Sequence, residues 1–228
     1  MDLSWSALAQ GARDISLVIP GPFSVALLAS VAAAGAGLSA VQTYVMVGVT
    51  FAGASQFAAL DLLTGGAAAP IVVLTALLIN ARFAIFSASL APHFRERSTG
   101  WRWLLGAVLS TPASVLSLTR FAADDGVDEV SYYLGAALSL WTAWQVGTLL
   151  GLALGARVPQ HAGLTFVVPL VFIGLLFSTI DDRPTAVAAA VGGVVGVAAE
   201  PLPMGLGFLV GAFVGVAVGQ VADWRWGA

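Results

Sequence analysis

Long apolar runs dominate the pattern of hydrophobic and polar positions along this chain, and short links between them carry most of the charged side chains. The runs lie at about 15–36, 42–63, 70–91, 103–120, 131–155, 163–180, 184–199 and 202–222. Most of them reach the ~20 residues that an α-helix needs to cross a bilayer. The seventh is short and fits a half-helix or re-entrant segment. The pattern therefore predicts seven or eight membrane segments.

The composition agrees with this pattern. Hydrophobic residues make up 59% of the 228 residues and charged residues only 9%, whereas soluble domains carry about 25% charged residues. We therefore expect an all-α, polytopic integral membrane helix bundle that forms one membrane domain over residues 1–228. The formal net charge of −3 is spread along the chain, which gives no support to nucleic-acid binding.

Arginines in the short links predict the orientation of the segments. The link 92–102 carries three arginines, so the positive-inside rule places it in the cytoplasm. The acidic link 120–130 then lies outside, with a spanning helix at 103–120 between the two. The same counting places Arg13 and Arg225 outside, against the rule. A re-entrant piece near each end of the chain would remove this conflict.

Two Pro-x-Pro sequences, at 20–22 and 201–203, each precede an apolar run rich in glycine and alanine. Proline removes a backbone donor and disfavours helix in the residue before it. Each site should therefore be a break at which one helix stops and another begins. Paired breaks of this kind are typical of transporters built as inverted repeats with broken helices. The simpler alternative is two prolines at ordinary helix starts.

The sequence does not predict an enzyme. It has no His-Glu-x-x-His, no Gly-x-Ser-x-Gly and no lysine for a Walker A motif. The two histidines, His93 and His161, lie at segment ends. We therefore expect no catalytic residue, no metal site and no cofactor.

Arg82 is the unusual residue of the third run. A charge placed deep in a membrane helix costs about 2.5–3.5 kcal/mol. The side chain can reduce this cost by extending to the interface, or it can line a water-accessible pathway. A guanidinium pairs with a carboxylate through two hydrogen bonds, so amino acids or carboxylates are natural cargo. Asn80 and Ser87 add polar groups along the same segment, and we take all three as candidate substrate-binding residues.

A second polar stretch, "FAGASQFAALDLLTGG", spans residues 51–66. Its Gly-Ala-Ser sequence permits close helix packing, which alone explains most such stretches. Gln56 needs partners for its amide in an apolar segment, so we add Ser55 and Gln56 to the candidate binding residues. Around Pro112, hydroxyl side chains should satisfy the carbonyl that the proline leaves without a donor.

Proton coupling would require a titrating group in or near the membrane. The candidates are Asp14, Asp61, Glu129 and Glu200. Glu200 stands out because it directly precedes the second Pro-x-Pro, although a solvated carboxylate in a turn explains it equally well. Glycines recur every fourth residue in the last run, which predicts close helix packing. They are Gly207, Gly211, Gly215 and Gly219.

Two of these stretches carry a family resemblance. "FAGASQFA" at 51–58 and "NARFAIFSASLAP" at 80–92 resemble the two most recognisable motifs of the AzlC-type family, the large subunits of bacterial branched-chain amino-acid exporters. "WQVGTLLG" at 144–151 and "LTFVVPLVF" at 164–172 follow in a similar order. The chain departs from the family at Phe83, where a histidine is common, and at Thr165, where an aspartate is common. Two potential titrating groups are therefore missing.

The resemblance implies a two-component secondary exporter in the bacterial cytoplasmic (inner) membrane. Its cargo would be branched-chain or related L-amino acids, moved outward by the proton-motive force. Its partners would be protons, the lipid bilayer and an AzlD-type small membrane subunit. The alternatives are a passive channel for a small polar solute and a packing scaffold without a pathway.

Overall fold

The computed structural model describes residues 3–123, 126–155, 180, 182–202 and 206–226, and within these ranges the regular structure is entirely helical. Residues 163–179 of the expected sixth segment lie outside the described residues. The elements are α1 (Trp5–Ile15), α2 (Pro20–Gly35), α3 (Ala40–Tyr44), the π-helix η1 (Val45–Val49), α4 (Gly53–Thr64), α5 (Ala69–Asn80), α6 (Arg82–Phe94), α7 (Thr99–Ala107), α8 (Thr111–Ala123), α9 (Glu129–Gly155), α11 (Arg183–Ala198) and α12 (Leu206–Trp226).

The all-α fold class is confirmed. Three helical stretches of the described chain are long and apolar enough to cross a membrane: Ala69–Phe94, α9 and α12. The pair α1 and α2 forms a fourth if its 68° bend is accepted within one crossing. These stretches establish a helical membrane bundle, while the expected count of seven or eight segments stays a prediction.

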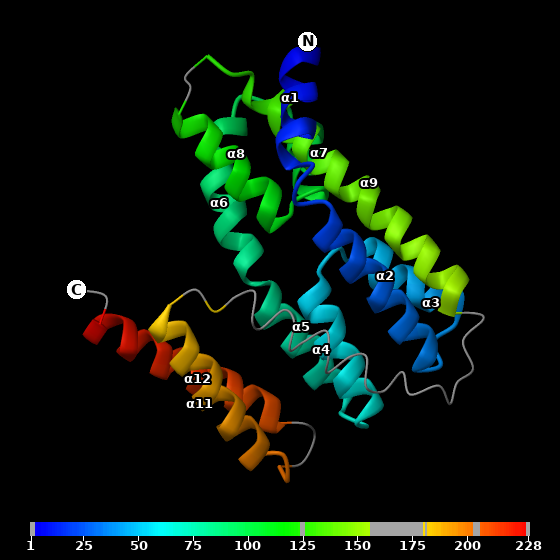
Figure 1. Cartoon of the computed structure of the whole chain (residues 1–228), viewed down its shortest axis with the longest axis vertical. Coiled ribbons are helices and arrows are strands. Elements are labelled where there is room, and N and C mark those ends of the chain that lie inside the picture. Colours follow the sequence, from blue (N-terminus) through cyan, green and yellow to red (C-terminus); the bar gives the residue numbers. More distant parts are fainter. Residues whose placement is uncertain (1–2, 124–125, 156–179, 181, 203–205, 227–228) are drawn as a thin grey trace. The chain divides into compact units, whose positions relative to one another are not determined.

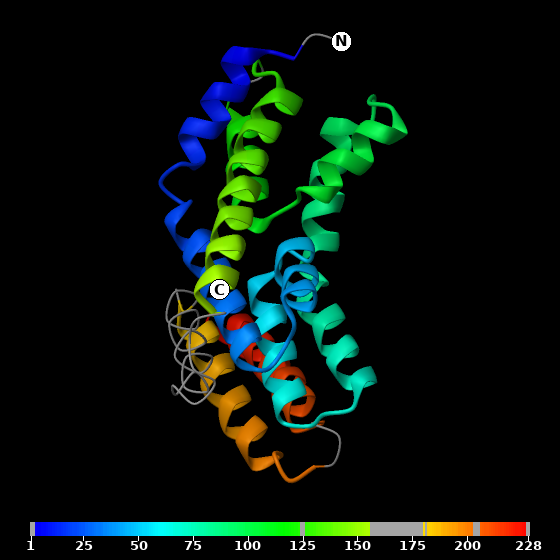
Figure 2. The ribbon, with the colours of Figure 1, turned by 90° about the vertical axis from the view of Figure 1, so that its right-hand side faces the viewer.

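The chain forms two compact units. The first contains residues 1–56 and 79–160, and the second contains residues 57–78 and 161–228. In the first unit, α1 and α2 follow one another along α9 (Figures 1 and 2). Glycines of α9 make this contact close. A Cβ added at Gly147 would lie 2.5 Å from the carbonyl oxygen of Phe23 in α2, so this face of α9 cannot accept side chains.

Both Pro-x-Pro sequences are helix breaks, as predicted. Pro20 is the first residue of α2, whose axis turns 68° from that of α1. Near the C-terminus, α11 ends at Ala198 and α12 begins at Leu206. The two breaks nevertheless differ in geometry. α1 and α2 continue along one path beside α9, whereas α11 and α12 fold back on each other as an antiparallel hairpin.

The prediction of one spanning helix at 103–120 is wrong. α7 ends at Ala107 and α8 begins at Thr111, and their 9 and 13 residues fall short of the ~30 Å hydrocarbon core. Pro112 lies in the first turn of α8. A backbone N–H in the first turn has no partner within the helix, so the proline removes no helical hydrogen bond here. The nearby hydroxyl of Ser114 donates instead to the carbonyl of Ser110 (2.7 Å).

α7 and α8 together leave one end of the first unit and return to it. At that end, His93 Nδ1 of α6 lies 2.7 Å from Glu129 Oε1 of α9. The rings of His93 and Phe121, near the end of α8, are 4.9 Å apart between centroids. The last residues of α6, the last residues of α8 and the first residues of α9 therefore share one level. We name α7 and α8 the re-entrant pair.

The re-entrant pair changes the orientation of the links. The link 92–102 and the described residues of the link 120–130 lie at the same end of the first unit, so the predicted alternation between them is wrong. α1 begins at this end too, because the backbone N–H of Ser4 donates to Ser131 Oγ of α9 (2.9 Å). Arg13 is therefore on a helix that starts at the arginine-rich end. Arg13 lies in the last turn of α1 rather than in a link, so the count that placed it outside does not apply.

Candidate functional site

The expected second segment is interrupted near its middle. The π-helix η1 ends at Val49 and α4 begins at Gly53. Between them, Phe51 has a φ of +48°, which is rare for a bulky residue. Its ring packs edge-on against Trp144, 5.1 Å away between centroids. Trp144 is close to the middle of α9, so this first helix break lies at mid-depth of a 27-residue span.

Side chains bind carbonyls of the π-helix η1 directly before the first helix break. The carbonyl of Val47 accepts hydrogen bonds from Gln56 Nε2 (3.1 Å) and from Trp144 Nε1 (2.8 Å). The carbonyl of Gly48 accepts one from Gln145 Nε2 (2.9 Å). Non-helical backbone persists at membrane depth only where protein groups or water satisfy it, and π-helical turns occur frequently at functional sites.

The second helix break is a one-residue interruption of the single Ala69–Phe94 span, at Ala81 between α5 and α6, and Ala81 keeps α-helical backbone angles. The two breaks meet, because Asn80 Nδ2 donates to Ser55 Oγ of α4 (3.0 Å). The structure thus brings together three of the predicted binding residues, Ser55, Gln56 and Asn80. We name this group the mid-span cluster.

Two side-chain oxygens of the mid-span cluster are hydrogen-bond acceptors that receive no hydrogen bond from the described residues. Ser55 Oγ donates to the carbonyl of Ala52 (2.9 Å), so it accepts from the amide nitrogen of Asn80 and orients that amide. Gln56 is oriented in the same way by its bond to Val47. Within the described part of the chain, the remaining oxygens, Asn80 Oδ1 and Gln56 Oε1, are buried and have no hydrogen-bond partner. A buried polar atom without a partner costs about 1–3 kcal/mol, and such an atom calls for a ligand or water.

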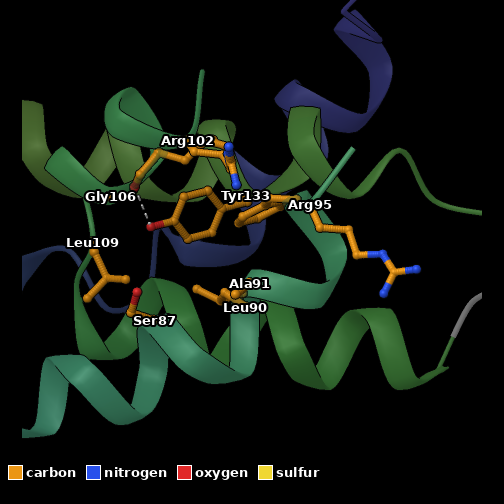
Figure 3. A pocket seen from close by; sticks show the side chains of 10 residues that line it. Ser87, Leu90, Ala91, Arg95, Arg102, Gly106, Leu109 and Tyr133 are labelled. Carbon is orange, nitrogen blue, oxygen red and sulfur yellow. Dashed lines mark hydrogen bonds between the residues drawn. The ribbon is translucent and has the colours of Figure 1, made fainter. Parts of the chain in front are cut away.

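Arg82 lies deeper than the sequence predicted. The helical stretch continues to Phe94, so Arg82 is about 18 Å from its end rather than about 13 Å. Its side chain is exposed on the first unit, with the guanidinium carbon 5.2 Å from the ring centroid of Phe83. Ser87 is not part of the mid-span cluster. It lines a separate cavity together with Arg95 and Arg102 (Figure 3).

The four candidate coupling residues are distributed over both units. Asp14 accepts a hydrogen bond from the hydroxyl of Tyr132 (2.8 Å), and Glu129 pairs with His93. In the second unit, Asp61 and Glu200 are exposed and line one cavity of about 850 Å³ beside α11 and α12. None of the four makes a described contact with the mid-span cluster. Among the described residues, no cluster of His, Asp or Glu side chains could hold a metal ion.

The four glycines of the last run face α11. A Cβ added at Gly207, Gly211, Gly215 or Gly219 would come within 2.5–2.9 Å of atoms at the break or on α11. Residues that the sequence reasoning missed are Trp144 and Gln145, which hold the π-helix. Gln145 could have been noticed, because it is an amide within an apolar run. Its partner could not, because Gly48 lies 97 residues away in the sequence.

Comparison with known proteins identifies the family. Residues 18–158 match the family described as AzlC protein. The chain belongs to the AzlC family. The "Inner membrane protein YgaZ" of Escherichia coli (strain K12) is 24% identical over 207 residues, which cover 86% of this chain and 84% of that protein. Uncharacterized membrane proteins of two Helicobacter pylori strains are 32% identical over 126 residues, which cover 55% of this chain and 54% of theirs. No solved structure matches.

The AzlC match contains both helix breaks, the re-entrant pair and α9, while α11 and α12 lie beyond it. Family membership and the helical spans make this chain a membrane protein and indicate a role in membrane transport.

Proposed function

We propose that this AzlC protein is the large subunit of a two-component secondary exporter that moves branched-chain or related L-amino acids out of the bacterial cytoplasm across the inner membrane. The observation that carries the proposal is the mid-span cluster. Two interrupted helices meet there, and two buried carbonyl oxygens, Gln56 Oε1 and Asn80 Oδ1, have no partner in the described chain. A cargo ammonium group supplies the donors that these oxygens lack.

The carboxylate of an amino acid would use the other side of the breaks. α4 and α6 begin at Gly53 and Arg82, and the N-terminal end of a helix favours negative charge. Arg82 adds a guanidinium that fits a carboxylate through two hydrogen bonds. Broken helices with such ends near the bilayer midplane are a common way to build a transporter site. The apolar surroundings of the breaks would receive a hydrocarbon side chain.

Energy coupling and the partner subunit belong to the same proposal. Outward transport against a gradient by a secondary carrier requires coupling to a second gradient, and in this proposal the proton-motive force would act through one of Asp14, Asp61, Glu129 and Glu200. Glu129 is the first to test, because its pairing with His93 (2.7 Å) offers two adjacent proton-binding groups. An AzlD-type small membrane subunit would complete the exporter.

The test uses proteoliposomes that contain this protein, with and without the AzlD-type subunit. Loading them with unlabelled leucine should drive accumulation of labelled leucine by counterflow, and the flux should saturate. A panel of amino acids then defines the cargo. Flux that rises linearly with concentration and shows no counterflow would establish a passive channel instead.

A matched pair of variants locates the site. Gln56→Leu removes a buried amide from the mid-span cluster, and we expect counterflow to fall at least about tenfold. Gln220→Leu makes the same change at an exposed position of α12 and should stay within about twofold. If both variants transport equally well at matched protein levels, the cargo does not bind at the mid-span cluster.

A further inference from the structure

A second site lies at the arginine-rich end of the first unit. A cavity of about 260 Å³ opens between α6 and the re-entrant pair, with Tyr133 of α9 at its side (Figure 3). Its walls are mainly apolar side chains, among them Leu90, Phe94 and Leu105. The hydroxyl of Tyr133 donates to the carbonyl of Leu105 (3.1 Å). This hydrogen bond links α9 to α7 beside the cavity, so a contact between two helices holds the cavity wall in place.

Arg95 and Arg102 also line this cavity, and Figure 3 shows the guanidinium of Arg102 beside Tyr133 and that of Arg95 turned away from the other labelled side chains. Both side chains are exposed, and Arg102 Nη2 donates to Thr99 Oγ1 (3.3 Å). Among the described residues, the one ion pair is that of Glu129 with His93, so neither arginine is paired with a carboxylate. No acidic residue lines the cavity. The lining of this cavity is therefore basic, while Arg95 also lines a neighbouring cavity with Glu96, Asp128 and Glu129.

Large apolar side chains on the two helices that line the cavity are exposed. Ile85 of α6 and Trp103 and Leu104 of α7 are exposed by 69%, 77% and 47%, on helices of a membrane protein. Tryptophan is enriched where the hydrocarbon core meets the headgroups. The arginines lie where α6 ends and α7 begins, which is where a short re-entrant element meets the interface. An apolar cavity with cationic residues at this level fits a molecule that has an anionic head and a hydrocarbon chain.

We propose that this cavity binds an anionic phospholipid of the membrane leaflet at the arginine-rich end. The phosphate would bind the fork of Arg102, which suits phosphate oxygens, with Arg95 adding a positive charge at the same cavity, and part of one acyl chain would enter the apolar cavity. A zwitterionic amino acid fits less well, because its ammonium would meet two cations and no acceptor carboxylate. Basic pockets between membrane helices are a known form of lipid headgroup site. The proposal does not depend on the cargo.

The test measures lipid binding to the intact protein in detergent by native mass spectrometry, with phosphatidylglycerol and phosphatidylcholine of equal chain length. We expect a clear preference for phosphatidylglycerol. Arg102→Gln should weaken phosphatidylglycerol binding about tenfold, and Arg95→Gln should weaken it less. Arg97→Gln is the matched control. It removes the same charge from the same link, but Arg97 does not line this cavity, so binding should change less than twofold.

A second variant tests the acyl chain without changing charge. A Cβ at Gly106 would meet no atom within 4 Å, so Gly106→Leu should fold and partly fill the cavity. It should also weaken phosphatidylglycerol binding.

Three results would overturn the proposal. The first is equal binding of the two lipids. The second is an equal effect of Arg97→Gln and Arg102→Gln, which would indicate general surface charge. The third is full competition by glycerol phosphate or leucine, which would indicate a site for a free anion or for cargo.

Discussion

The tight packing of α11 against α12 gives a quantitative prediction for Gly211→Ala. A Cβ at this position would lie 2.7 Å from both the carbonyl oxygen of Gly192 and the Cα of Gly196. Ordinary contact begins at 3.4 Å, so α11 must move away by about 0.7 Å and lose dispersion contacts along the hairpin. Overpacking of this kind costs about 1–3 kcal/mol.

Gly193→Ala supplies the control. Gly193 lies on α11, and a Cβ there would meet nothing within 4 Å. Both substitutions replace glycine by alanine inside a helix, so both gain about 1 kcal/mol of helix propensity. The difference between the two variants therefore isolates the close contact. At about 2–4 °C per kcal/mol for a chain of this size, Gly211→Ala should melt about 2–12 °C below Gly193→Ala.

Melting is followed as the fraction of protein that stays monodisperse on size-exclusion chromatography after heating in one detergent. Hydrogen exchange of the α11 amides reports the hairpin directly, because local opening need not follow global unfolding. Faster exchange should be confined to Gly211→Ala. Equal melting temperatures and equal exchange in the two alanine variants would show that the helices are not in close contact at Gly211.

Three further predictions follow from the fold. Single cysteines at Ser98 and Gly126 should react with a membrane-impermeant reagent from the same side, and labelling from opposite sides would mean that α7 and α8 cross the membrane. Arg82→Lys keeps the charge but loses the two-bond fork, so it should fold and lose most amino-acid efflux, and wild-type efflux would mean that Arg82 only extends to the interface. Asp182 caps α11 by accepting from the backbone N–H of Thr185 (2.7 Å), and hydrogen bonds from the side chain and the backbone of Thr185 lower the pKa of Asp182. The contribution of Asp182 to stability should be present at neutral pH and should decline as the pH falls through this lowered pKa. Melting curves recorded at decreasing pH should show this decline for the wild type and not for Asp182→Asn.

The sequence alone determined the class of this protein and the places where its helices start. Apolar runs at low charge require a bilayer, since a chain so poor in polar side chains cannot cover a water-facing surface. Pro20 and Pro201 marked helix breaks because proline acts on its immediate neighbours. Gln56, Ser55 and Asn80 stood out because a polar group in an apolar run needs a partner, whatever the fold.

Only the tertiary structure decided where those partners are and how deep each helix goes. An apolar run in the sequence indicates only that the segment lies in apolar surroundings. A helix that crosses the membrane and the re-entrant pair both meet this condition. The contact between His93 and Glu129, 36 residues apart, decides for the re-entrant pair, because it brings the end of α6 and the start of α9 to the same level. The meeting of the two helix breaks through Asn80 and Ser55 likewise depends on packing between distant segments, because hydrogen bonds of this kind leave no periodic trace in either segment.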